Sequence, residues 1–169
     1  MTLSVMRRRT SFLGASFVAS LVVLATTALG GTAHTTPSTP CASRVQGGVL
    51  PVWMRAGFGQ NARVTHVIGR RGAIGAVLWN KPLYSPPAQH VNNKILWVPR
   101  YLSKSVAPMW IKMQKMDGTR LVGEPVRRIV ANGPGPSYVD APSAGCWRLT
   151  LTWSGRRDTL DLSYIAPTD

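Results

Sequence analysis

The segment from Ser143 to Ile165 constrains the fold more strongly than any other part of the sequence. Apolar and polar residues alternate along it in two runs, and Ser154-Gly155-Arg156-Arg157 stands between them. The apolar positions are Trp147, Leu149, Leu151 and Trp153 in the first run, and Leu160, Leu162 and Tyr164 in the second. Alternation with a period of two, in runs rich in aromatic and β-branched residues, is typical of strands with one buried face. The segment therefore predicts a β-hairpin near the C-terminus.

Similar signals recur upstream of this hairpin. Two further hairpins are expected, over residues 64–79 around Gly69-Arg70-Arg71-Gly72 and over residues 109–130 around Asp117-Gly118, because glycine supplies the positive φ that tight turns need. The mostly apolar run Lys94–Val98, ended by Pro99, predicts a buried strand, and shorter strands are expected at 48–53 and 137–139. About seven or eight short strands, with no convincing helix, predict an all-β domain built as a β-sandwich.

The segment from Lys81 to Asn93 carries Pro82, Pro86 and Pro87. Proline is excluded from helix interiors and central strands, so this segment is expected to be a long loop. Long loops often carry functional residues. A hydrolytic or metal-handling site in residues 81–93, near His90 and Tyr84, is therefore the alternative to a purely binding role.

Residues 1–33 have the pattern of a secretory signal peptide. Met6-Arg7-Arg8-Arg9 is positively charged, the run Ser11–Leu29 contains no charge, and small residues follow it. An uncleaved N-terminal anchor is the alternative, since about 18 apolar residues is the lower limit for crossing a bilayer. Residues 34–47 are expected to be a linker rich in Thr, Pro and Ser, and residues 48–169 a single domain. We therefore expect a secreted or envelope-located protein whose mature form does not span a membrane.

The chain is strongly basic, with 20 Lys+Arg against 6 Asp+Glu. Loss of Arg7, Arg8 and Arg9 with the signal peptide leaves a net charge of about +11. Such a charge attracts anionic partners over long distances, although it also keeps an exported protein in solution. An anionic polymer of the cell envelope or a protein partner is expected. Nucleic acid is not, because the protein is expected outside the cytoplasm and lacks a stacking-aromatic motif.

Three pairs of adjacent arginines are the candidate binding residues. These are Arg70-Arg71, Arg127-Arg128 and Arg156-Arg157. The first and last pairs stand in predicted hairpin turns, and the middle pair stands near the end of a predicted strand. If the turns share one end of the sandwich, the guanidinium groups would form a patch that takes phosphate or carboxylate in a bidentate manner. A solvated face of an arginine-rich protein is the alternative interpretation.

Cys41 and Cys146 are the two cysteines of the chain. In an oxidising compartment an even number favours a disulfide, and two cysteines permit one intramolecular pairing. Cys146 has the outward parity of its strand, so the bridge is expected to pin the N-terminal segment against the outside or the end of the sheet. Closing a loop of about 105 residues contributes on the order of 4–5 kcal/mol in the chain-entropy description.

The C-terminal hairpin also carries a resemblance to a known family. The block Pro142–Leu151 contains Gly145-Cys146-Trp147 and is followed by Trp153-Ser154-Gly155 and Asp161-Leu162. It resembles the last hairpin of uncharacterised secreted bacterial proteins with an Ig-like domain, and Leu50–Phe58 and Asn93–Val98 resemble further blocks of these proteins. The resemblance covers most of the mature chain and implies a single Ig-like antiparallel β-sandwich. It implies no catalytic or ligand-binding residues, because none is assigned for that family.

Motifs for catalysis are absent from the sequence: there is no Gly-x-Ser-x-Gly elbow, no phosphate-binding loop and no His-Glu-x-x-His. Asp158 is expected at a turn and Asp161 on the solvent face of its strand, where they would form surface pairs with the nearby arginines. His66 and His90 are not spaced like metal ligands. We therefore expect no catalytic residue, no bound metal and no cofactor.

Six tryptophans are many for this length. Trp79, Trp97, Trp147 and Trp153 match buried strand positions, whereas Trp53 and Trp110 could instead line a groove for a sugar or a peptide. Met109 and Met113 share one strand face and Met116 the other, which favours core packing over a copper site. The expected function is an exported, non-catalytic binding or structural module. A scaffold whose exposed edge strand pairs with a partner chain is another possibility.

Overall fold

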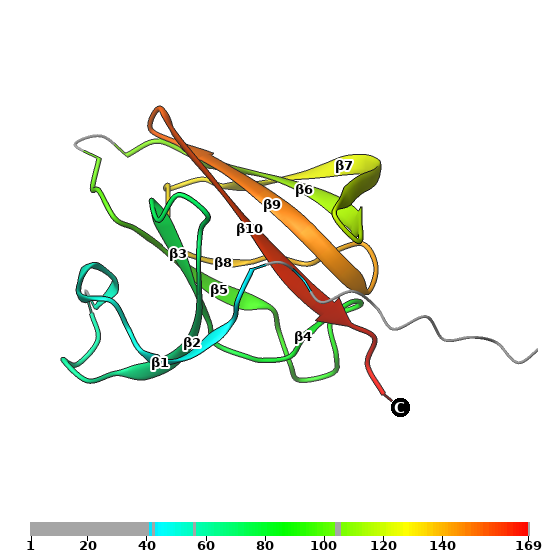
Figure 1. Ribbon diagram of the computed structural model, residues 1–169, viewed down its shortest axis with the longest axis horizontal. Coiled ribbons are helices and arrows are strands. Elements are labelled where there is room, and N and C mark those ends of the chain that lie inside the picture. The colour runs from blue at the N-terminus through cyan, green and yellow to red at the C-terminus, as the bar shows by residue number, and fades with distance from the viewer. Residues whose placement is uncertain (1–40, 42, 56, 104–105, 169) are drawn as a thin grey trace, which may run out of the picture. The chain divides into compact units, whose positions relative to one another are not determined.

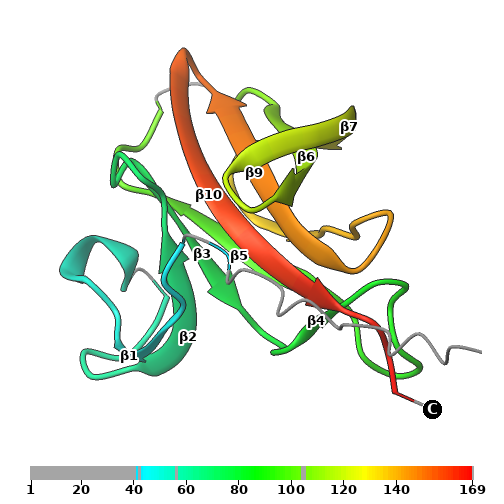
Figure 2. The same cartoon turned by 45° about the vertical axis from the view of Figure 1, so that its right-hand side comes forward.

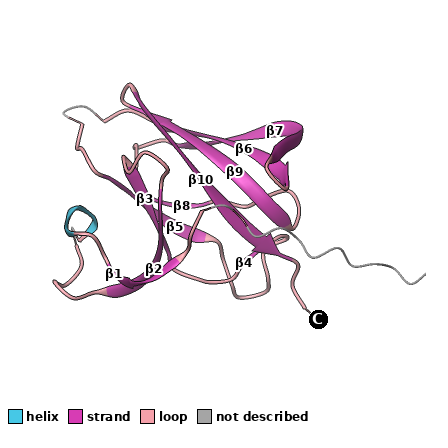
Figure 3. Cartoon of the chain, viewed as in Figure 1, coloured by secondary structure: helices cyan, strands magenta, loops and turns pink. Residues whose placement is uncertain are grey.

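The computed structural model describes residues 41–168 except 42, 56, 104 and 105. The described residues form ten strands, labelled in Figure 1, and one short 3-10 helix, η1 (Val52–Met54), drawn in cyan in Figure 3. The strands are β1 (Gln46–Val49), β2 (Arg63–Ile68), β3 (Ile74–Leu78), β4 (Leu83–Tyr84), β5 (Lys94–Pro99), β6 (Met109–Asp117), β7 (Arg120–Val130), β8 (Pro136–Tyr138), β9 (Gly145–Trp153) and β10 (Arg156–Ile165). The predicted all-β class is confirmed. The predicted signal peptide, residues 1–33, lies outside the described residues.

The strands are arranged in two five-stranded sheets. The first has the order β1-β2-β3-β5-β8 and the second the order β4-β10-β9-β6-β7. Neighbouring strands are antiparallel, except that β10 and β4 pair in parallel through Tyr164 and Leu83. In Figure 2, β10, β9, β6 and β7 lie on one side and β1, β2 and β3 on the other. The predicted sandwich is confirmed, with ten strands; β4 lies in the segment that was expected to be a loop throughout.

The main apolar core lies between the two sheets. Ile74, Ile95 and Trp97 enter it from the first sheet, and Leu149 and Leu160 enter it from the second. The inward positions of β9 and β10 are those that the alternation in the sequence predicts, and Met109 and Met113 also pack here as predicted. Each fully buried side chain of this size stabilises the fold by roughly 1.5–3 kcal/mol. The core thus fixes which face of each strand points outward.

A second apolar cluster covers the outer face of the first sheet. Leu50 and Met54 pack against Val77 there, bordered by Trp53 and Phe58. The segment expected to be an edge strand over 48–53 is therefore divided: β1 ends at Val49, and the residues after it fold into η1 over the sheet. Gly75 is required beneath this cover, because a Cβ at that position would overlap the Met54 side chain.

The prediction that Trp79 is buried is wrong. Its side chain is 51% exposed, because β3 ends at Leu78 and Trp79 has the outward parity of Val77. Its ring lies beside Phe58, with centroids 6.2 Å apart, and the Lys94 ammonium lies 5.5 Å from its centroid. Trp79 therefore belongs to the border of the second cluster and not to the core.

Part of the predicted linker belongs to the folded domain. Cys41 is bonded to Cys146, the Ser43 hydroxyl accepts a hydrogen bond from Asp161 N–H (2.7 Å), and Val45 packs against the main core. β1 begins at Gln46 and pairs with β2. The domain thus extends upstream of residue 48, while residues 34–40 lie outside the described part of the chain. Among the described residues, no helix has the length and apolar character needed to cross a membrane.

Candidate anion-binding groove on the second sheet

The outer face of the second sheet carries a groove bordered by basic side chains. Its volume is about 280 Å³. The residues that line it are Trp110, Ile111, Lys112, Arg127, Thr150, Thr152 and Arg157. They come from β6, β7, β9 and β10, and no acidic residue is among the residues that line the groove. We call this set the basic groove.

Strand register explains why these side chains meet. Arg157 pairs with Thr152, and Thr152 pairs in turn with Trp110. In the next outward row, Thr150 pairs with Lys112, and Lys112 pairs with Arg127. Paired residues of antiparallel strands present their side chains on the same face of the sheet, about 5 Å apart. The two threonines are short and form the floor, while the longer side chains stand around them.

The three cations of the basic groove are not neutralised within the described part of the chain. No ion pair or side-chain hydrogen bond joins Lys112, Arg127 or Arg157 to another described residue. The two ion pairs found among the described residues both end at Asp161. Like charges gathered in a concave, partly apolar site create a local positive potential, which raises the concentration of anions there.

The structure separates the members of two predicted arginine pairs. Arg127 lines the groove, whereas the Arg128 guanidinium donates to the carbonyl oxygens of Arg127 (3.1 Å) and Asp140 (3.4 Å). Arg157 lines the groove, whereas the Arg156 guanidinium lies 4.8 Å from the centre of the Tyr101 ring. Successive side chains of a strand point to opposite faces. Adjacent arginines on one strand therefore cannot serve the same outer-face groove.

The third pair, Arg70 and Arg71, lies in the β2–β3 turn, and this turn rests against β10. Arg70 N–H donates to the carbonyl oxygen of Thr159 (2.8 Å), and Arg71 N–H donates to the Asp158 carboxylate (2.9 Å). The turns that carry the first and last predicted pairs are thus close together. The side chains of the two arginines nevertheless differ in their contacts. Arg70 forms an ion pair with Asp161, whereas Arg71 is exposed and its side chain forms no hydrogen bond or ion pair with a described residue.

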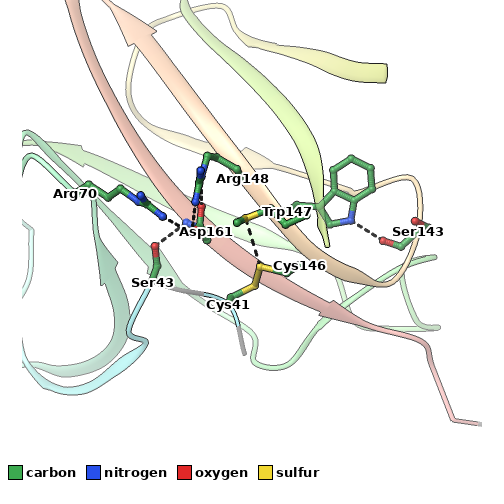
Figure 4. Close-up of a disulfide and its surroundings, with 9 residues drawn as sticks. Cys41, Ser43, Arg70, Ser143, Cys146, Trp147, Arg148 and Asp161 are labelled. Carbon is green, nitrogen blue, oxygen red and sulfur yellow. Dashed lines mark hydrogen bonds and ion pairs between the residues drawn. A yellow bond between two sulfur atoms is a disulfide. The ribbon is translucent and has the colours of Figure 1, made fainter. Parts of the chain in front are cut away.

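Asp161 joins three segments beside the disulfide (Figure 4). Its carboxylate accepts hydrogen bonds from Arg70 Nη2 (2.8 Å) and from Arg148 Nε (2.8 Å), and its side chain is fully buried. Burial alone would raise the pKa of Asp161, but the bonds from Arg148 and Arg70 outweigh it and hold the pKa below its ordinary value. The prediction of a solvent-facing Asp161 is wrong, because Ser43 and the two guanidinium groups lie against it.

The disulfide between Cys41 and Cys146 is confirmed. Cys146 pairs with Met116 of β6, and its sulfur lies 3.9 Å from the Met116 sulfur. Met116 has the outward parity that the sequence predicts, yet it is only 7% exposed because the bridged N-terminal segment lies on that face. The bridge therefore fastens the N-terminal segment to the outside of the sheet, as expected, and does not cross the core.

Asp158 is also buried, in contrast to the expected surface pairing. Its carboxylate accepts hydrogen bonds from the N–H groups of Arg71 (2.9 Å), Ala73 (2.9 Å) and Thr159 (2.7 Å). It thereby closes the β2–β3 turn onto the start of β10. Gly69 is required beside it, because a Cβ on Gly69 would overlap the Asp158 carboxylate. Three donated backbone bonds satisfy a buried carboxylate without a cation, so Asp158 has a structural task.

Asn93 and Ser85 hold the 81–93 segment in place through side-chain hydrogen bonds. Asn93 accepts a bond from Tyr84 N–H (2.9 Å) and donates to the carbonyl oxygen of Tyr84 (2.8 Å) and to Asp140 (2.7 Å). Ser85 donates to the carbonyl oxygen of Ala141 (2.7 Å). His90 is exposed, and His66 is buried under the second cluster. Within the described residues, no three His, Cys, Asp or Glu side chains come together as a possible metal site.

The chemistry of the basic groove is that of a binding site for anions. It offers three cations that are unpaired among the described residues, two threonine hydroxyls and the 52% exposed indole of Trp110. No known protein family, curated protein or solved structure matches this chain. A function must therefore be argued from these groups. Guanidinium groups bind carboxylate and phosphate with two parallel hydrogen bonds, and an ammonium binds them as a point charge.

Sequence reasoning missed Lys112, Thr150 and Thr152 as parts of the site. The period-two alternation of β6 and β9 places each of them on an outward face, so the sequence predicts that their side chains point outward. These side chains come together because β6 pairs with β9, although β7 and β8 lie between the two strands in the chain. No local pattern in the sequence specifies that pairing.

Proposed function

We propose that the protein is an exported, non-catalytic binding module that holds an anionic polymer of the cell envelope in its basic groove. The observation that carries the proposal is that Lys112, Arg127 and Arg157 line one groove, with no carboxylate among its lining residues. The disulfide supports export, because disulfides persist in oxidising compartments. Membership in the secreted Ig-like family that the Gly145-Cys146-Trp147 segment resembles is part of the same proposal.

The large positive charge of the chain also makes unspecific attraction to any anion expected, so the test must separate the groove from the total charge. Arg127→Gln combined with Arg157→Gln removes two charges from the groove. Arg128→Gln combined with Arg156→Gln removes two charges from neighbouring positions whose side chains do not line it. The two variants have equal net charge and nearly equal sequence. A difference between them therefore reports on the groove alone.

The measurement is retention of the purified protein on isolated bacterial envelopes across a salt series. From about 0.01 M to about 1 M salt the Debye length falls from about 30 Å to about 3 Å, so retention through charge falls steeply. We expect the groove variant to release at clearly lower salt than the wild type and the control variant close to the wild type. Equal release of the two variants would refute the groove as the binding site. Retention that is insensitive to salt would instead indicate a protein partner held by apolar contacts.

A further inference from the structure

Trp110 differs from Trp79 and Tyr101, two other partly exposed aromatic side chains. The Trp79 ring has Phe58 and Lys94 as partners, and the Tyr101 ring has a guanidinium on it. For Trp110, no hydrogen bond, ring contact or cation contact joins its side chain to any described residue. It nevertheless stands on β6, an inner strand of the sheet, and is 52% exposed. Both an indole N–H donor and an apolar ring are thus offered to a ligand.

The three cations stand on three different strands and do not converge on one point. Arg157 stands on β10, two strands away from β6, which is about 10 Å at the usual strand spacing. Lys112 and Arg127 stand in the neighbouring row, two residues further along their strands. A compact dianion such as a phosphate is held best by donors that converge on it. Cations spread over several strands instead fit single negative charges spaced along a chain.

Between the cations lie groups that bind sugars. The Thr150 and Thr152 hydroxyls can both donate and accept hydrogen bonds, as sugar hydroxyls do. The indole of a tryptophan offers a flat apolar face together with one polar tip. We propose that the ligand is an acidic polysaccharide, whose sugar ring stacks on Trp110 while carboxylates of neighbouring sugars reach Arg157 on one side and Lys112 and Arg127 on the other. This inference rests on the proposed function, and it adds the class of polymer.

Three probes separate the parts of this inference. Oligogalacturonate carries both rings and carboxylates, polyphosphate carries charge without rings, and dextran carries rings without charge. Binding of each to the purified protein is measured by calorimetry at one fixed salt concentration, with the polyanions matched in charge. We expect oligogalacturonate to bind more tightly than polyphosphate, and dextran to bind weakly. Equal affinity for the two polyanions would overturn the inference of a sugar ligand.

The role of the indole is tested with Trp110→Ala, and Trp79→Ala is the matched control, because Trp79 is equally exposed on the other sheet. We expect Trp110→Ala to weaken oligogalacturonate binding about tenfold, to leave polyphosphate binding unchanged, and Trp110→Phe to retain most of the affinity. The Trp110 indole N–H resonance should shift on addition of oligogalacturonate but not of dextran at the same sugar concentration. Unchanged binding in Trp110→Ala would refute the stacking role.

The two proposals fail in different ways. If polyanion binding depends on Arg127 and Arg157 but not on Trp110, the anionic-polymer function stands and the sugar inference falls. If oligogalacturonate binding is indifferent to Arg127→Gln combined with Arg157→Gln, both fall. Circular dichroism and thermal unfolding of each variant establish that the fold is intact. The substituted side chains are exposed, so large losses of stability are not expected.

Discussion

Asp161 joins parts of the chain that lie far apart in the sequence. Arg70 reaches it from the β2–β3 turn, Arg148 from β9, and the Ser43 hydroxyl accepts the bond from its backbone N–H. A buried carboxylate without its cations would leave an uncompensated charge in a poorly solvated place. The two arginines are therefore committed to structure, which removes them from the set of cations available to a ligand.

Replacement of Asp161 by Asn should lower the free energy of unfolding by about 3 kcal/mol, because the guanidinium groups lose their charged partner. The folded pKa of Asp161 is depressed, so its contribution is present above the ordinary carboxyl pKa of about 4 and is lost as the pH falls through the folded value. The wild type should therefore lose stability on acidification, and Asp161→Asn should lack that part of the loss. Urea unfolding at several pH values measures both effects.

Asp117→Asn is the matched control for this prediction. Asp117 is an exposed aspartate beside the β6–β7 turn and forms no ion pair with a described residue. Its substitution should change the stability by less than about 0.5 kcal/mol. If Asp161→Asn and Asp117→Asn have the same free energy of unfolding at every pH, the ion pairs of Asp161 with Arg70 and Arg148 do not stabilise the fold.

At the scale of elements, the hairpins were predictable because their signals are local. Alternation and turn glycines located β2–β3, β6–β7 and β9–β10 close to their observed limits. The partners of each hairpin were not predictable, because pairing of β6 with β9 is decided by the packing of the whole core. The same limit applies to the site: Arg127 and Arg157 were among the candidates, while their separation from Arg128 and Arg156 and the addition of Lys112 follow from register.

The burial of Asp158 and Asp161 could not be predicted from the sequence either. Each has the local sequence of an exposed turn or strand residue, and each is covered by a segment far away in the chain: the β2–β3 turn for Asp158 and the segment at Ser43 for Asp161. A polar residue becomes buried only when distant donors satisfy it. Composition does not identify these donors, because the sequence contains many more arginines than carboxylates and does not show which arginine bonds which carboxylate.

The N-terminal segment around Cys41 and Ser43 is joined to β9 by the disulfide and to β10 by a hydrogen bond. Replacement of both Cys41 and Cys146 by Ser should lower the free energy of unfolding by on the order of 2–4 kcal/mol, because a loop spanning 105 residues is no longer closed in the unfolded chain. Amide exchange at Asp161 should also accelerate, since its N–H is bonded to Ser43. Chemical denaturation with and without reductant, and hydrogen exchange, measure these effects.

Ser43→Ala provides the comparison, because it removes the hydrogen bond and keeps the disulfide. Loss of this bond should cost about 1 kcal/mol and accelerate exchange at Asp161 less than the double cysteine variant does. If the double cysteine variant unfolds at the same denaturant concentration as the oxidised wild type, the bridge does not stabilise the domain, and the assigned role of the N-terminal segment is wrong.

On the scale of the whole molecule, the distribution of charge matters more than its total. Asp158 and Asp161 are buried and satisfied, and Asp140 receives a bond from Asn93. Much of the negative charge of a chain with only 6 acidic residues is thus committed internally, while Lys112, Arg127 and Arg157 line a groove and form no ion pair with any residue that the structure describes. The unfolded chain has the same net charge but no groove. Folding therefore creates a local site and leaves the total charge unchanged.

This difference predicts how an anionic polymer changes thermal stability. A ligand that binds only the folded state at ten times its Kd adds about 1.4 kcal/mol, which raises the Tm of a domain of this size by a few °C. Oligogalacturonate should raise the Tm of the wild type and of the Arg128→Gln, Arg156→Gln variant, but raise that of the Arg127→Gln, Arg157→Gln variant much less. A polyanion that is attracted only by total charge binds the unfolded chain as well, so it would give no increase, or an equal change in the two variants, which have the same net charge. Calorimetric scans at fixed salt distinguish a folded groove from unspecific attraction.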